Sequence, residues 1–117
     1  MSDKVLLLVT SLTGNPIQEA TQRNIRTAFQ AKKIVFDELD AMLPENRDRR
    51  NELFEKSGLK GKFPQVFIIS NAGLEFVGDG EKLNELLELD DLPAEVVDAN
   101  PDIMNFTKTF ANCQKSS

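Results

Sequence analysis

The chain has 117 residues, a length typical of one domain, and its apolar content of 40% is sufficient for an ordinary hydrophobic core. The formal net charge is −5, from 19 acidic and 14 basic residues, without the basic excess of nucleic-acid-binding proteins. There is no histidine and only one cysteine, so the commonest general base and the usual ligands of zinc and haem are missing. The composition therefore argues against most classes of enzyme, and we expect no cofactor and no metal.

Two features of the composition have ordinary interpretations. The cluster Arg47, Arg49 and Arg50 is interleaved with acidic residues, which is typical of a solvated helix face. Cys113 cannot form an intramolecular disulfide, and we expect its thiol to lie in a frayed tail. The apolar run at residues 5–9 is too short for a signal peptide or a membrane span, so we expect a protein of the cytoplasm, with a nuclear location left open, and no membrane or nucleic-acid partner.

The first elements form a β-α-β unit. The continuous apolar run at residues 5–9 predicts a strand buried on both faces. Asn15 is the predicted N-cap of a helix that begins at Pro16 and runs to about Lys33, because Pro is favourable at the first helical position. A second strand is predicted at residues 34–39, parallel to the first.

The next elements are a helix and an antiparallel hairpin. The helix is predicted to begin at Leu43-Pro44 and to end at Gly58, a typical C-cap. Strands are predicted at residues 65–70 and 74–78, and the short Asn71-Ala72-Gly73 turn between them makes the pair antiparallel.

A third helix follows the hairpin. Asp79 is its predicted N-cap, and Leu83, Leu86 and Leu87 form its apolar face. The resulting order, β-α-β-α-β-β-α, is that of a thioredoxin fold in its glutaredoxin-like form, with a mixed four-stranded sheet flanked by helices. We expect this domain to occupy residues 1–92.

Residues 93–117 are expected to be a C-terminal extension with a short helix and a frayed end. Residues 93–100 have the composition of a connector, and Pro101 is a plausible start for the last helix. Ile103, Phe106 and Phe110 form a narrow apolar stripe, which either docks on the domain or engages a partner.

Three stretches carry a more specific resemblance: residues 33–40 (KIVFDELD), 45–47 (ENR) and 76–80 (FVGDG). With them, residues 5 to 92 resemble the Src-homology-3-binding glutamic-acid-rich-like proteins, in which a glutaredoxin-like domain has lost its redox cysteines. The resemblance implies a Ser- and Gly-rich turn after the first strand, as at residues 10–14, and a cis-proline before the third strand, as at Pro64. The chain departs from the family in two ways: residues 61–66 hold one proline and cannot present PxxP, and no glutamic-acid-rich tail is present.

The resemblance also implies where a ligand or partner would bind. In glutaredoxins a cleft holds glutathione beside the cis-proline. Its walls here should be the turn at residues 10–16, the segment 63–65 and the turn at residues 78–79, so weak binding of glutathione or a peptide is expected. Helix N-termini in such a cleft attract carboxylates. The candidate cleft residues are Ser11, Thr13, Phe63, Pro64, Gln65, Gly78 and Asp79.

Two functions remain open. Because the turn holds hydroxyls and no thiol, dithiol and monothiol oxidoreductase activity are excluded there, and an unactivated Ser is a poor nucleophile. The first function is a non-catalytic module that binds a protein partner whose identity the sequence does not reveal. The alternative is a glutathione-binding or glutathione-transferase-like protein in which Ser11 or Thr13 stabilises a bound thiolate.

Overall fold

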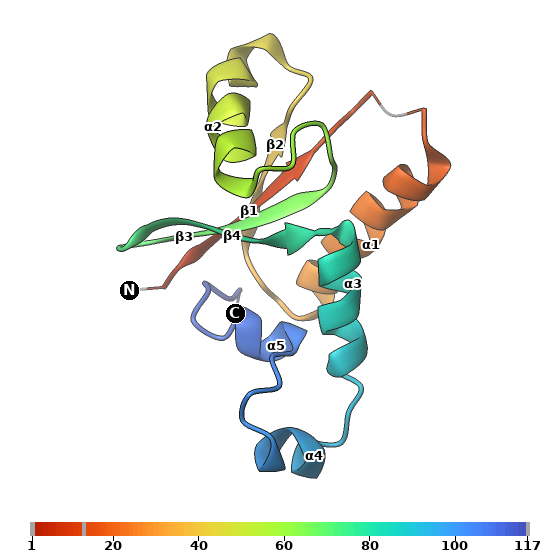
Figure 1. Cartoon of the computed structure of the whole chain (residues 1–117), viewed down its shortest axis with the longest axis vertical. Helices are drawn as coiled ribbons and strands as arrows, with labels where there is room; N and C mark the ends of the chain where they lie inside the picture. Colours follow the sequence, from red (N-terminus) through yellow and green to blue (C-terminus); the bar gives the residue numbers. More distant parts are fainter. Residues whose placement is uncertain (1, 13, 117) are drawn as a thin grey trace.

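The structure is a computed structural model that describes residues 2–12 and 14–116. Four strands and their helices alternate along the chain much as predicted (Figure 1). The candidate residue Thr13 lies outside the described residues. The elements are β1 (Lys4–Val9), α1 (Pro16–Ala31), β2 (Phe36–Asp40), η1 (Pro44–Asn46), α2 (Arg47–Ser57), β3 (Gln65–Ser70), β4 (Gly73–Asp79), α3 (Gly80–Leu89), α4 (Ala94–Ala99) and α5 (Phe106–Thr109).

The strands form one mixed sheet in the order β2-β1-β3-β4. β1 is parallel to β2, in a register that pairs Val9 with Asp40, and antiparallel to β3. β3 and β4 form the predicted antiparallel hairpin. The prediction of a mixed four-stranded sheet flanked by helices is therefore confirmed.

Helices cover both faces of the sheet (Figure 1). Val5, Leu7 and Val9 pack against α1, α3 and α5, whereas Leu6 and Leu8 pack on the face that α2 covers. This alternation explains why the sequence of β1 is a continuous apolar run. In the described part of the chain, no helix is long and apolar enough to cross a membrane.

Three of the predicted helix ends are confirmed, whereas the helix expected from Leu43-Pro44 begins as a 3-10 turn, η1, and α2 starts only at Arg47. Asn15 accepts hydrogen bonds from the backbone N–H groups of Ile17 and Gln18 at the start of α1, and Asp79 accepts one from Lys82 at the start of α3. Gly58 has φ 72° and ends α2 in the left-handed conformation that glycine adopts without strain.

The second strand is shifted from its prediction. It covers Phe36–Asp40, two residues later than expected, because Ile34 instead forms a bridge with Lys115 and the N–H of Val35 donates to the carbonyl of Gln114. The apolar residues at 34 and 35 suggested an earlier start, and a contact with the chain's far end could not be read from them.

The tail has more structure than predicted. The expected connector contains α4, and the last helix begins at Phe106 and not at Pro101, because the side chain of Asn105 caps it by accepting from the N–H of Lys108. Phe106 and Phe110 are 0% exposed and their rings lie 5.4 and 5.2 Å from that of Phe29. The stripe therefore docks on the domain, the first of its two interpretations.

The expectation of a frayed thiol at Cys113 is wrong. Cys113 is 4% exposed and forms a parallel bridge with Asp3, beside β1. Burial raises the pKa of its thiol, and the Asp3 carboxylate adds to this, while the Lys115 ammonium acts in the opposite direction. The thiol is therefore a neutral core group at ordinary pH and a poor nucleophile.

Candidate functional site

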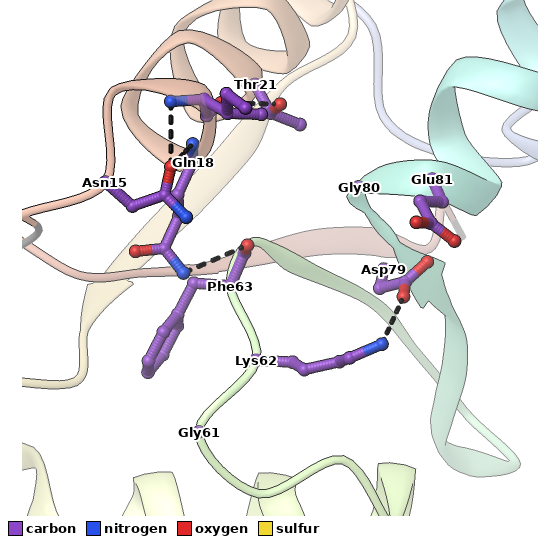
Figure 2. A pocket seen from close by; sticks show the side chains of 10 residues that line it. Asn15, Gln18, Thr21, Gly61, Lys62, Phe63, Asp79, Gly80 and Glu81 are labelled. Atoms are coloured by element: carbon purple, nitrogen blue, oxygen red, sulfur yellow. Dashed lines mark hydrogen bonds and ion pairs between the residues drawn. The ribbon is translucent and has the colours of Figure 1, made fainter.

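A groove of about 270 Å³ opens between the start of α1, the loop before β3 and the start of α3 (Figure 2). Two walls come from the predicted Phe63 and Asp79 segments, whereas the third comes from Asn15 and the first turns of α1, and the described residues 10–12 do not line it. Of the seven candidate residues, Phe63 and Asp79 line this groove. The polar side chains of its walls are Asn15, Gln18, Thr21, Lys62, Asp79 and Glu81.

The α1 wall is held to the opposite loop by a side chain. Gln18 Nε2 donates to the carbonyl oxygen of Phe63 at 3.5 Å, which joins α1 to the segment before β3. Asn15 Oδ1 accepts from the N–H of Ile17 at 2.9 Å and from that of Gln18 at 3.3 Å. The hydroxyl of Thr21 donates to the carbonyl of Ile17 at 2.8 Å, so its hydrogen is already used within the helix.

Opposite charges face each other in the groove (Figure 2). Lys62 Nζ lies 3.7 Å from Asp79 Oδ2, while Asp79 Oδ1 accepts from the N–H of Lys82. Lys62 is well exposed, and ion pairs of this kind contribute little to stability, about 0–1 kcal/mol. Both groups can therefore exchange this contact for one with a ligand, Lys62 with a carboxylate and Asp79 with an ammonium group.

Close packing behind the groove depends on two glycines. A Cβ atom at Gly80 would lie 2.7 Å from Thr21 Cγ2 and 3.3 Å from Pro64 Cδ. A Cβ at Gly78 would lie 2.5 Å from Lys82 Cβ. Gly78 is buried and is not among the described residues that line the groove, so its role is to let α3 begin close to β4.

The segment before β3 supports the groove from behind. The Phe63–Pro64 peptide is cis, as the resemblance implied, and Pro64 is buried beneath the groove against Gly80. Gln65 is fully buried, and its Nε2 donates to the carbonyls of Leu59 at 2.6 Å and Lys62 at 2.8 Å. Gln65 therefore fixes the loop that carries Lys62 and does not face a ligand.

Ser11 lies away from the groove. Its N–H donates to Asp40 Oδ1 at 3.1 Å, and it lines a separate hollow beside Asp40. Burial acts to raise the pKa of Asp40, but the hydrogen bonds from the Ser11 hydroxyl and from the N–H groups of Met42 and Ser11 outweigh it, so the pKa is lowered. The structure thus does not bring Ser11 together with Phe63 and Asp79.

The turn after β1 is further fixed by Gln22. The N–H of Thr10 donates to Gln22 Oε1 at 2.9 Å, and Gln22 Nε2 donates back to the carbonyl of Thr10 at 3.2 Å. Both groups are buried. This pair continues the hydrogen bonding of β1 by one residue and holds the Ser11 backbone toward β2.

The groove offers polar binding groups. The polar side chains among its described lining residues are two amides, a hydroxyl, one ammonium and two carboxylates, and none of them is an activated nucleophile. Within residues 2–12 and 14–116, no group of three or more His, Cys, Asp or Glu side chains is placed to hold a metal ion. The arrangement suits recognition of a polar ligand with both charges.

Sequence reasoning missed Gln18 and Lys62 as groove residues. Lys62 directly precedes Phe63, so its position beside the predicted cleft was available as a signal. Gln18 lies 45 residues from its partner Phe63, and only the fold brings the two together.

No protein-family model and no curated protein matches the chain.

Proposed function

We propose that the chain is a glutaredoxin-like domain with a thioredoxin fold that acts as a non-catalytic, cytoplasmic protein-binding module. Support for the fold comes from the β2-β1-β3-β4 order, the single parallel pair and the placement of α2 opposite α1 and α3. Pro64 lies directly before β3, where the resemblance requires it.

Membership of the Src-homology-3-binding glutamic-acid-rich-like family is part of this proposal. The three motif stretches fall at β2, at the η1–α2 junction and at the β4–α3 junction. The last of these contains Gly78 and Gly80, which the close packing around α3 requires. The last motif thus has a structural reason to be present, which supports the family's fold and does not indicate a particular partner.

The observation that carries the proposed function is the groove itself. It retains three walls, an ammonium and two carboxylates, while Ser11 lines a separate hollow, where its backbone N–H donates to Asp40. A thiolate-stabilising hydroxyl would have to face the groove, so the position of Ser11 does not favour Ser11 as that hydroxyl, and Thr13 lies outside the described residues. We therefore place binding before catalysis.

Glutathione or an extended peptide is the ligand chemistry that the groove favours. Lys62 and Asp79, 3.7 Å apart, provide partners for a carboxylate and an ammonium group of one ligand. Such exposed pairs support binding in the millimolar range, which corresponds to about −4 kcal/mol. Glutathione binding without turnover is the second candidate function.

The test is a two-dimensional NMR titration of the ¹⁵N-labelled chain with reduced glutathione, followed by an assay of glutathione conjugation. We expect saturable shifts at Gln18, Lys62 and Asp79 and no turnover. Lys62→Met should weaken these shifts, whereas Lys60→Met, in the same loop but away from the groove walls, should not. Turnover that exceeds the uncatalysed rate would contradict the proposal of a non-catalytic module.

A further inference from the structure

A second surface, apart from the groove, has the composition of an interface. Seven large apolar side chains are exposed in the described part of the chain, and three of them, Leu12, Met42 and Leu43, lie in the loops that follow β1 and β2. Leu12 is 77% exposed. We call these three residues the apolar edge. Exposed apolar residues that lie close together often mark a protein–protein interaction site.

One carboxylate holds the two loops side by side. Asp40 Oδ1 accepts from the N–H of Ser11 at 3.1 Å and from that of Met42 at 3.0 Å. The N–H of Ala41 also donates to the carbonyl of Val9 at 2.9 Å. The backbone segments that carry Leu12 and Met42 are therefore held side by side at the carboxyl ends of two parallel strands.

A hollow of about 260 Å³ lies beside the apolar edge and has unbalanced charge. Leu43 lines it together with Ser11, Arg26, Glu38 and Asp40. Arg26 is already paired with Glu38. In the described residues Asp40 has no cationic partner, although its neighbours Ser11 and Met42 satisfy one of its oxygens. The hollow thus has one carboxylate in excess.

We propose that the apolar edge and this hollow bind a segment of a partner protein in which an Arg or Lys side chain is flanked by apolar residues. The basic side chain enters the hollow and pairs with Asp40, and its apolar neighbours cover Leu12 and Met42. Arginine and apolar anchors are the residues that dominate the energy of protein interfaces. The carboxylates disfavour an anionic lipid surface as the occupant.

This surface goes beyond the groove and does not depend on the groove's ligand. The two hollows share no described lining residue. The proposal and the glutathione titration can therefore succeed or fail separately, because the chemical shifts that report each site come from different residues.

The test selects peptides from a phage-displayed random library on the immobilised full chain, and then measures the affinity of a synthetic winner by fluorescence anisotropy. We expect winners with Arg or Lys beside Leu, Ile, Phe or Met. Leu12→Ser and Asp40→Asn should each weaken binding by about tenfold or more, since hot-spot residues carry most of the affinity. Asn at position 40 keeps an acceptor for the two N–H groups, and Met104→Gln, at another exposed apolar side chain, is the matched control.

Several outcomes would overturn the proposal. These are a library without winners, winners without a basic residue, binding that survives Asp40→Asn, and peptide-induced shifts at Lys62 and Asp79 in place of residues 10–12 and 40–43. Self-association of the wild-type chain that Leu12→Ser abolishes would identify a second copy as the occupant. Binding to vesicles of anionic lipid that is lost in Leu12→Ser would identify a membrane.

Discussion

The two ends of the parallel strand pair differ in what covers them. At the amino ends of β1 and β2, the tail closes the fold: Asp3 bridges Cys113, Ile34 bridges Lys115, and Phe106 and Phe110 belong to the core. At the carboxyl ends, the loops present Leu12, Met42 and Leu43 to solvent.

At the covered end the apolar residues are buried and stabilise the fold, whereas at the open end they remain exposed and accessible to a partner. Phe106 and Phe110 are fully buried and contribute to folding. Leu12 is 77% exposed, so its side chain contributes little buried area to folding. Substitutions at the two ends test this difference between buried and exposed apolar residues, beginning at the covered end.

Removal of the tail should have the largest effect. A chain that ends at residue 92 lacks Phe106, Phe110 and Cys113, all of which belong to the main core. We expect it to lose its cooperative unfolding transition in urea, because the open core would no longer offset the chain entropy. A cooperative transition at the full-length midpoint would show instead that residues 1–92 fold without the tail.

A single ring from the tail should account for much of this loss. Phe110→Ala leaves a cavity beside Phe29 and Phe106 and should lower the free energy of unfolding by about 3–5 kcal/mol. Chemical denaturation followed by circular dichroism measures the change. The control Val96→Ala, at an exposed position of α4, should change stability by less than about 1 kcal/mol.

Gly80 tests the packing that positions the groove. In Gly80→Ala the new Cβ would meet Thr21 Cγ2 at 2.7 Å, so either the Thr21 side chain or α3 has to shift, at a cost of about 1–3 kcal/mol. Gly14→Ala is the matched control, since nothing lies within 4 Å of a Cβ there. Thermal denaturation that leaves Gly80→Ala as stable as Gly14→Ala would contradict this account of the α1–α3 contact.

Asp90 makes attachment of the tail depend on pH. Its carboxylate accepts from the N–H of Thr107 at 3.0 Å and from the Thr107 hydroxyl at 2.9 Å, and it lies 2.9 Å from Lys32 Nζ. Burial acts to raise the pKa of Asp90, but the bonds from Lys32 and Thr107 outweigh it and lower the pKa below 3.8. The stability that it adds is therefore present above pH 3.8 and is lost as the pH falls through the lowered value.

Asp90→Asn should remove that pH dependence. Hydrogen bonds to charged groups contribute about 1.5–3 kcal/mol at most, so the variant should lose about 1–2 kcal/mol at pH 7 and less in acid. Urea denaturation at several pH values measures it, with Asp91→Asn at an exposed neighbour as control. Parallel stability curves for Asp90→Asn and the wild type would contradict the role of the Asp90 carboxylate.

Local signals explain what the sequence could predict. Asn15, Gly58 and Asp79 end or begin helices through their own side chains or φ angles, so each was correctly assigned from its neighbours alone. The apolar run of β1 and the short turn of the β3–β4 hairpin are likewise local.

What was missed depends on contacts between distant residues. The backbone N–H of Ser11 donates to Asp40, 29 residues away, and this contact holds Ser11 outside the expected cleft. Cys113 is buried because the tail returns to β1, which no local pattern indicates. Loops and tails are positioned by such long-range contacts, and sequence reasoning therefore placed the walls of the groove better than its side chains.

The apolar edge should contribute the least to stability. Leu12→Ser removes a side chain that is 77% exposed, so we expect the free energy of unfolding to change by less than about 0.5 kcal/mol. Urea denaturation beside Phe110→Ala gives the direct comparison between the open and the covered end. A loss above about 2 kcal/mol would mean that Leu12 packs in the native chain, and the edge would then be part of the core and not a surface kept for a partner.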